Sequence, residues 1–117
     1  MIVREGEIIG RGSKAPIESH DPTAHAEMLA IREACQKVGS ERLTGHDLYV
    51  TLEPCPMCAG LIVNARIPRV VFAAPDPKAG AAGTLMNLLE DPRLNHRCEV
   101  VRGLLATESA ELLTTFF

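Results

Sequence analysis

Aromatic side chains and an excess of positive charge are both missing from this sequence. Its 117 residues include no tryptophan, one tyrosine and three phenylalanines. So few rings do not provide an extended surface on which successive nucleic-acid bases stack. The formal net charge is −3, so any nucleic acid would be held by a local patch or a pocket rather than by a general basic field.

The sequence also has no long apolar run. No stretch approaches the roughly 20 apolar residues that a membrane-spanning helix needs, and no charged start followed by an apolar segment occurs after Met1. We therefore expect a soluble, cytoplasmic protein. With a hydrophobic content of 46%, a chain of this length can bury about two-thirds of its unfolded surface, enough for one domain over residues 1–117.

Cysteine is scarce, with four residues in the chain. In a cytoplasmic protein, cysteines are expected to be metal ligands or free thiols rather than a disulfide framework. Cys55 and Cys58 form a C-x-x-C pair. Cys35 lies on the apolar face of an expected helix, and we interpret both Cys35 and Cys98 as core residues.

Apolar segments with the period of a strand alternate with segments that have the period of a helix, a pattern that predicts an α/β fold. The expected strands cover residues 1–3, 7–12, 48–52, 69–74 and 99–102, and the expected helices cover residues 23–38, 55–65, 84–89 and 106–117, with a loop over 75–83. The first helix has the best-defined limits, because Asp21 can cap its start, Pro22 favours its first turn and Gly39 follows its last periodic residue.

The chemistry of the chain is carried by two short motifs, His25-Ala26-Glu27 and Pro54-Cys55-Pro56-Met57-Cys58. They supply one imidazole and two thiols as metal ligands, together with a carboxylate that the metal does not need. A structural zinc site is closed by four protein ligands, whereas a catalytic site has three and keeps a vertex for water. His25, Cys55 and Cys58 are three ligands, so the pattern predicts catalytic zinc, whose bound water has a pKa of about 7.

The spacing of these residues sets a geometric requirement. Cys55 and Cys58 can share one face of a helix, in whose first turn the N–H groups favour thiolates. His25 and Glu27 are about 200° apart around an ideal helix, so they can converge on one ion only at the helix end. If they converge, Glu27 can take a proton from the zinc-bound water and pass it to a ring nitrogen and the leaving amine.

Both motifs resemble the H-x-E and P-C-x-x-C signature of the zinc-dependent nucleobase deaminases. The wider sequence is similar to the bacterial tRNA-specific adenosine deaminases of the cytidine/deoxycytidylate deaminase superfamily. The similarity runs nearly end to end and is carried by residues 21–28, 49–60, 66–72, 76–83, 94–97 and 112–117. The resemblance implies zinc-dependent hydrolytic deamination of adenosine to inosine at the wobble position of tRNA, where the target base is swung into the pocket.

The resemblance also implies an architecture and partners. The family has a three-layer α/β/α fold with a central mixed sheet, and it forms homodimers that bind the tRNA anticodon loop. By this likeness Asp76 and Lys78 would border the nucleotide entrance. We further expect backbone N–H groups around Ala26 and the Cys55 turn to steady the incoming base. Phe116 and Phe117 are expected to pack the last helix against the sheet, with stacking of Phe117 on a base as the alternative.

Three features depart from the family pattern. The family's first helix and most of its first strand have no counterpart before Met1. Lys14 stands where the family has an asparagine that bonds the flipped nucleotide, so Lys14 is a candidate substrate contact that would alter base preference. No basic tail follows Phe117, which predicts weaker binding of tRNA phosphates than in the family.

The sequence leaves three alternatives open. The same zinc centre could serve a deaminase of a free base or nucleoside, such as guanine, cytosine or cytidine. Alternatively, His96 or Cys98 could close the fourth vertex of a structural zinc, which would leave Glu27 without a task. A non-catalytic, zinc-stabilised domain could instead bind a partner through the face left bare by the missing helix. We interpret His20 and His46 as solvent-facing turn residues.

Overall fold

The computed structural model of the chain describes residues 1–13 and 20–103. Three predictions lie outside the described residues: the substrate contact at Lys14, the helix over 106–117, and the packing or stacking of Phe116 and Phe117. The described residues form five strands and two helices.

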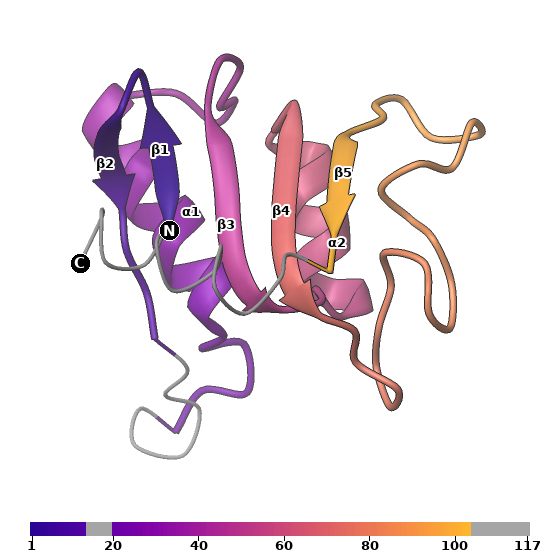
Figure 1. The fold of residues 1–117 in the computed structure, drawn as a ribbon. Helices are drawn as coiled ribbons and strands as arrows, with labels where there is room; N and C mark the ends of the chain where they lie inside the picture. Colours follow the sequence, from indigo (N-terminus) through magenta and orange to yellow (C-terminus); the bar gives the residue numbers. More distant parts are fainter. Residues whose placement is uncertain (14–19, 104–117) are drawn as a thin grey trace.

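A mixed sheet forms the centre of the fold (Figure 1). Its strands are β1 (Ile2–Arg4), β2 (Glu7–Gly10), β3 (Asp47–Leu52), β4 (Arg69–Ala74) and β5 (Glu99–Arg102), in the spatial order β2-β1-β3-β4-β5. β1 is antiparallel to both of its neighbours, whereas β3, β4 and β5 are parallel. The α/β class and the mixed sheet expected from the sequence are confirmed.

Two helices, α1 (Ala26–Val38) and α2 (Pro56–Asn64), lie on the same side of the sheet (Figure 1). Ile31 and Ile62 from the helices join Val70 from the sheet in one buried core. Each such side chain contributes about 1.5–3 kcal/mol when it is fully buried, so this contact between helices and sheet holds the described fold together. Neither described helix is long and apolar enough to cross a membrane.

Helix α1 begins three residues later than predicted, at Ala26, with His25 as its N-cap. The prediction of Asp21 as the cap is wrong. Its carboxylate accepts hydrogen bonds from the backbone N–H (2.8 Å) and the hydroxyl (2.6 Å) of Thr23, a local pattern with which aspartate forms turns instead of helices. The predicted end of the helix is confirmed, since Gly39 adopts the left-handed conformation with φ 67°.

The prediction of a helix over residues 84–89 is wrong. The N–H of Thr84 donates to the carboxylate of Glu53 at 3.1 Å, and the side chains of Leu85 and Met86 are exposed by 58% and 45%. The helical period of the apolar residues therefore does not mark a buried face. The N–H of Thr84 is taken up by a buried carboxylate outside the segment, and the N–H groups of Leu85 and Leu88 donate to the carbonyl oxygens of Gly80 and Ala81 instead of to a helical partner.

Two single-residue interpretations have opposite outcomes. His46 is 3% exposed, and its Nδ1 atom lies 2.9 Å from the carbonyl oxygen of Thr44, so its interpretation as a solvent-facing residue is wrong. Cys98 belongs to the buried core and Cys35 packs against that core, as predicted. All four cysteines are free thiols.

The carboxyl ends of four strands lie at one edge of the sheet. Because β1 is antiparallel to β2 and to β3, while β4 is parallel to both β3 and β5, the strands β2, β3, β4 and β5 run in one direction (Figure 1). Leu52 and Ala74, the last residues of β3 and β4, are paired. The edge outside such carboxyl ends is the usual place of ligand sites in α/β sheets. Both sequence motifs and the loop over 75–83 lie at this edge.

Two glycines allow the chain to pass close to helix α1. A Cβ atom at Gly10 would lie 2.1 Å from the carbonyl oxygen of Ala30, and one at Gly12 would lie 2.3 Å from that of Ala26. Both distances are shorter than any van der Waals contact with a backbone oxygen. Because Gly10 and Gly12 have no side chains, this segment can pack closely on α1, whose start carries the first motif.

Replacing Gly10 by alanine should lower the free energy of unfolding by about 1–3 kcal/mol, the usual cost of overpacking, because the backbone of α1 has to move. The matched control is Gly60→Ala in α2, where the added Cβ would meet no described atom within 4 Å apart from its chain neighbours and the nearby backbone of its own helix. This control should gain up to about 1 kcal/mol, since alanine favours helices over glycine. Urea unfolding measures both changes, and equal midpoints for the two variants would contradict the close approach.

Candidate metal centre and active site

Three metal-ligand side chains come together where the two helices begin. The Nδ1 atom of His25 lies 3.6 Å from the Sγ atom of Cys55 and 3.7 Å from that of Cys58. All three donor atoms lie within 4.8 Å of one another. A zinc ion, with bonds of about 2.3 Å to sulfur and about 2.0 Å to nitrogen, holds tetrahedral donors roughly 3.5–3.8 Å apart. The donor set therefore fits such an ion in both chemistry and spacing.

The near-equal distances from one ring nitrogen to two sulfur atoms need an explanation. A single imidazole nitrogen either donates one proton or accepts with one lone pair, so it can form one good hydrogen bond but not two. A cation shared by the nitrogen and both sulfurs accounts for the arrangement without this difficulty. The geometry thus favours a metal centre over a pair of thiol–imidazole hydrogen bonds.

Each donor is positioned by the start of a helix. His25 and Cys55 are the N-cap residues of α1 and α2, with extended backbones, and Cys58 lies in the first turn of α2. The sequence placed Cys55 inside that turn, and the structure moves it one position outside the helix. Neither N-cap side chain caps its own helix in the described structure. Both are therefore available to an ion, and the positive ends of two helix dipoles favour thiolates there.

Glu27 lies beside the donor cluster. It is the second residue of α1 and is half-buried. His25 stands before the helix with ψ 155°, so the angular separation of an ideal helix does not apply to this pair. The carboxylate of Glu27 adjoins the thiol of Cys58 and raises its pKa. That His25 and Glu27 converge on one ion at the helix end stays a prediction.

The electrostatics of the cluster call for a cation. Burial is the main cause that raises the pKa of the Cys58 thiol, and the charges of Glu27 and Cys55 raise it further. The thiolate form of Cys58 is therefore disfavoured without an added positive charge. A divalent ion bound by two thiolates and a neutral imidazole would have no net charge and would favour this thiolate.

The candidate fourth ligands lie elsewhere. The cluster found among the described residues has three members, His25, Cys55 and Cys58. The Nε2 atom of His96 lies 2.7 Å from the carbonyl oxygen of Ile67, and Cys98 is part of the buried core. Closure of a structural zinc site by either residue is therefore wrong, and an ion held by the three described donors would have a fourth position open to water.

The predicted substrate residues within the described chain lie at the same edge of the sheet. Ala26 is the first residue of α1, so its N–H has no acceptor within the helix. Asp76 follows β4, and its carboxylate accepts hydrogen bonds from the N–H groups of Lys78 (2.9 Å) and Ala79 (3.2 Å). Lys78 is exposed. That these residues contact a substrate stays a prediction.

Glu53 is a residue of the site that sequence reasoning missed. It is 3% exposed, and its carboxylate accepts hydrogen bonds from the N–H groups of Asp76, Ala82 and Thr84 and from the Thr84 hydroxyl. Burial alone would raise the pKa of Glu53, but these hydrogen bonds, led by the one from the hydroxyl, together lower the pKa. The available signal was an acidic residue between a buried strand and the P-C-x-x-C motif.

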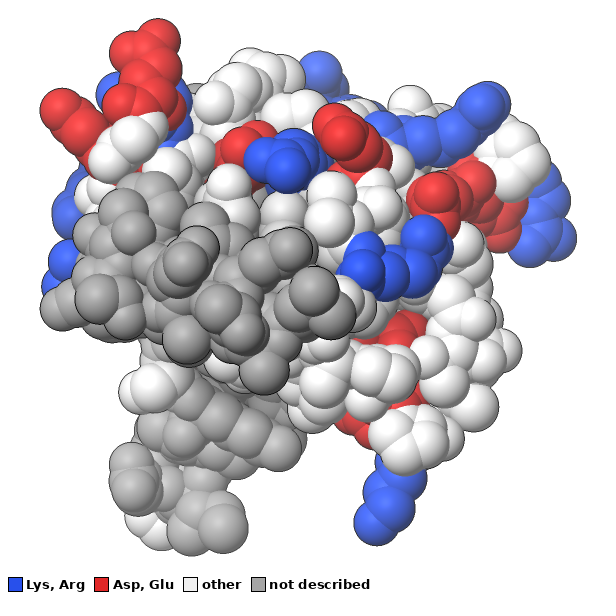
Figure 2. Space-filling view, viewed as in Figure 1, with Lys and Arg blue, Asp and Glu red and all other residues white. Residues whose placement is uncertain are grey.

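On the face shown in Figure 2, the Lys and Arg side chains of the described residues are interspersed with Asp and Glu side chains. That a nucleic acid would be held by local contacts or a pocket stays a prediction.

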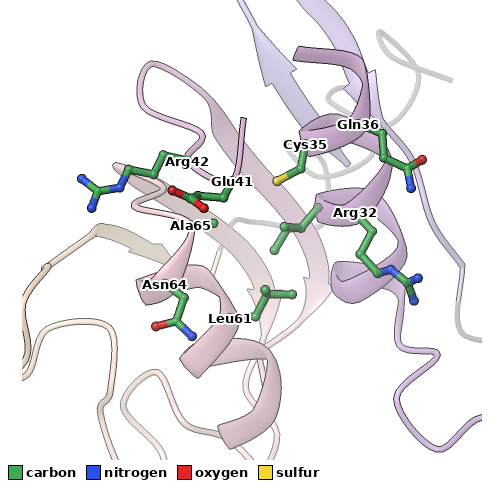
Figure 3. A pocket seen from close by; sticks show the side chains of 9 residues that line it. Arg32, Cys35, Gln36, Glu41, Arg42, Leu61, Asn64 and Ala65 are labelled. Atoms are coloured by element: carbon green, nitrogen blue, oxygen red, sulfur yellow. The ribbon is translucent and has the colours of Figure 1, made fainter. Parts of the chain in front are cut away.

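A hollow between α1 and α2 is separate from the donor cluster. Its lining residues are Ile31, Arg32, Cys35, Gln36, Glu41, Arg42, Leu61, Asn64 and Ala65. Figure 3 shows Cys35 and Leu61 pointing into the gap between the helices, whereas Arg32 and Arg42 point away from it. None of the three donors lines this hollow, so it is not part of the candidate active site.

Comparison with known proteins agrees with this arrangement. The family model of the MafB19-like deaminases matches residues 1–117. The tRNA-specific adenosine deaminase of Bacillus subtilis (strain 168) is 53% identical over 117 residues, which are all of this chain and 73% of the relative. The enzyme of the same name from Aquifex aeolicus (strain VF5) is 49% identical over all of this chain and 77% of the relative.

Solved structures give the same grouping. One from a study of A-to-I editing by tRNA:A34 deaminases at the wobble position of transfer RNA has a TM-score of 0.85 and 47% identity, covering 95% of this chain and 80% of that one. Guanine deaminase from Bacillus subtilis has a TM-score of 0.64 and 35% identity, covering 97% of this chain and 74% of its own. The chain therefore belongs to the MafB19-like deaminase family, in the group of the tRNA-specific adenosine deaminases.

Proposed function

We propose that this protein is a zinc-dependent hydrolase that converts adenosine to inosine at the wobble position of tRNA. The observation that carries the proposal is a cluster of three metal donors with a spare carboxylate beside it, in a chain similar over its full length to tRNA-specific adenosine deaminases. Water replaces the exocyclic amine of the base, so the products are inosine and ammonia.

His25, Cys55 and Cys58 would hold the zinc ion. Bound zinc would lower the pKa of a water molecule to about 7 and so supply the nucleophile. Glu27 would accept one proton of this water on its carboxylate and deliver it to the ring nitrogen, and a second proton, from the hydroxyl group added to the base, would pass through the same carboxylate to the leaving amine. Its place beside Cys58 suits this role.

The remaining contacts concern the RNA. The N–H of Ala26 would steady the base, and Asp76 and Lys78 would border the entrance. Lys14 and Phe117 are the other proposed substrate contacts, from outside the described residues. We further propose that the protein works as a homodimer in the cytoplasm on the tRNA anticodon loop, as the family resemblance implies.

A deaminase of a free base is the second candidate, because guanine deaminase shares the fold. The similarity to the tRNA:A34 deaminase structure is greater in both identity and TM-score, which favours the tRNA substrate. A direct comparison of the deamination rates on tRNA and on free bases decides between the two substrates.

Zinc-loaded protein should produce inosine and ammonia from an anticodon stem-loop with adenosine at position 34. Free guanine, cytosine and cytidine should react at least about 100-fold more slowly, because substrates without the remote binding contacts lose transition-state stabilisation. Chromatography of the products measures the rates, with a stem-loop carrying guanosine at position 34 as control. Ammonia released from a free base alone would contradict the tRNA assignment.

The donor cluster should bind one zinc ion per chain. Cys55→Ala should lower zinc affinity by more than the roughly 10–100-fold that loss of an outer-shell partner costs, since it removes a ligand itself. Cys35→Ala, a cysteine outside the cluster, is the matched control and should keep its zinc. Elemental analysis after dialysis measures both contents. Equal zinc in the two variants would refute the assignment of the ligands.

Glu27→Gln should keep the zinc and lower kcat by about 10²–10⁴-fold, the usual contribution of general acid–base catalysis. Glu33→Gln is the matched control, because Glu33 lies on the same helix, is exposed and pairs with Lys37. Single-turnover rates on the stem-loop measure the effect. Unchanged rates in Glu27→Gln would remove Glu27 from the mechanism. If the unaltered protein also lacked deaminase activity while it held zinc, the reading as a non-catalytic binding domain would be favoured.

A further inference from the structure

Glu53 joins the two loops that follow adjacent parallel strands. It comes directly after β3, and its N–H donates to the carbonyl oxygen of Ala74, the last residue of β4, at 2.9 Å. On the other side, the N–H of Ala81 donates to the carbonyl oxygen of Pro54 at 2.9 Å. The loop after β4 is thus fastened to the two residues that lead into Cys55.

The carboxylate of Glu53 fastens the same loop from inside. Oε1 accepts from the N–H of Asp76 (3.1 Å) and from the hydroxyl of Thr84, and Oε2 accepts from the N–H groups of Ala82 (2.9 Å) and Thr84 (3.1 Å). Backbone N–H groups only donate. A glutamine in this place would set its own NH₂ group against at least one of them, whichever way the amide is turned.

The loop is shaped to receive this side chain. A Cβ atom at Gly80 would lie 2.5 Å from the carboxylate carbon and from both oxygens of Glu53, so this position has no room for a larger residue. Asp76, held by Glu53 through its N–H, in turn accepts from the N–H of Lys78. The backbone at the exposed Lys78 therefore depends on Glu53 through one intermediate residue.

Both oxygens of Glu53 are engaged with donors of the loop, whereas Glu27 faces the metal donors. The two glutamates are therefore suited to different tasks. Glu27 can exchange protons at the metal centre. Glu53 has a fixed position and no partner among those donors in the described hydrogen bonds.

We propose that Glu53 is a positioning residue for the RNA substrate, which holds the loop over residues 75–84 beside Cys55 so that Asp76 and Lys78 can contact the nucleotides around the target base. This inference rests on the proposed function. It assigns Glu53 to the binding of RNA rather than to the chemical step. Loss of its hydrogen bonds should therefore change KM more than kcat.

The test compares Glu53→Gln with the unaltered full chain, both loaded with zinc, on the anticodon stem-loop. KM should rise by about 10-fold or more while kcat changes by less than about threefold, the signature of lost binding common to ground and transition states. Zinc should remain at one ion per chain. Glu99→Gln is the matched control, because this glutamate on β5 has an exposed side chain and should leave KM unchanged.

A second pair of variants keeps the test informative if Glu53→Gln does not fold. Thr84→Val removes only the hydroxyl donor to Glu53 and should raise KM in the same direction but less. Thr84→Ser keeps the hydroxyl and should match the unaltered protein. Circular dichroism at the assay temperature shows whether each variant is folded.

The outcomes separate the two proposals. An unaltered protein that does not deaminate the stem-loop contradicts the proposed function, and the role of Glu53 with it. An active unaltered protein, with an unchanged KM in folded Glu53→Gln or Thr84→Val, contradicts the role of Glu53 alone. Parallel loss of zinc and kcat in these variants would also overturn it, because Glu53 would then support the metal centre instead of the RNA contacts.

Discussion

Two thiols and an imidazole share a small, partly buried space, in which the thiolate form of Cys58 is disfavoured unless a positive charge lies nearby. This constraint explains why the donors sit where they do. Both N-cap positions lie outside the regular helix, so His25 and Cys55 can turn toward one point while their helices diverge from it. The positive helix ends add to the compensation that the ion provides. Zinc bound by two thiolates and a neutral imidazole would have no net charge and a fourth position open to water, which suits hydrolysis.

The sheet brings the parts of the site together. The strands β2, β3 and β4 run in the same direction, so the segments that follow them begin at one edge of the sheet. The pairing of Leu52 with Ala74 places the segments after β3 and β4 side by side. Gly10 and Gly12 let the third segment approach α1 to within contact distance of its backbone. The centre is therefore assembled from elements that are far apart in the chain but rigidly placed by the sheet and the core. Such support keeps donor atoms within the few tenths of an ångström that a metal site requires.

Sequence reasoning could find the metal donors because their information is local. The spacing of His25 to Glu27 and of Cys55 to Cys58, each near a helix start, already contains the ligand set. Hydrophobic periodicity in the sequence also located the described strands and both described helices, because the apolar residues of these elements are buried between the helices and the sheet. The start of α1 was misplaced because Asp21 satisfies a nearby turn instead of the helix. The role of Glu53 and the irregular segment around Thr84 could not be read locally, because the bonds that decide both join residues on different strands' loops.

Most of the bonds that Glu53 accepts come from main-chain N–H groups rather than from side chains. Main-chain donors are the same whatever residue carries them, apart from proline. Several positions of the loop can therefore change identity while its path stays the same. With the role proposed for Glu53, substitutions in this loop would alter nucleotide preference while the three metal donors stay in place.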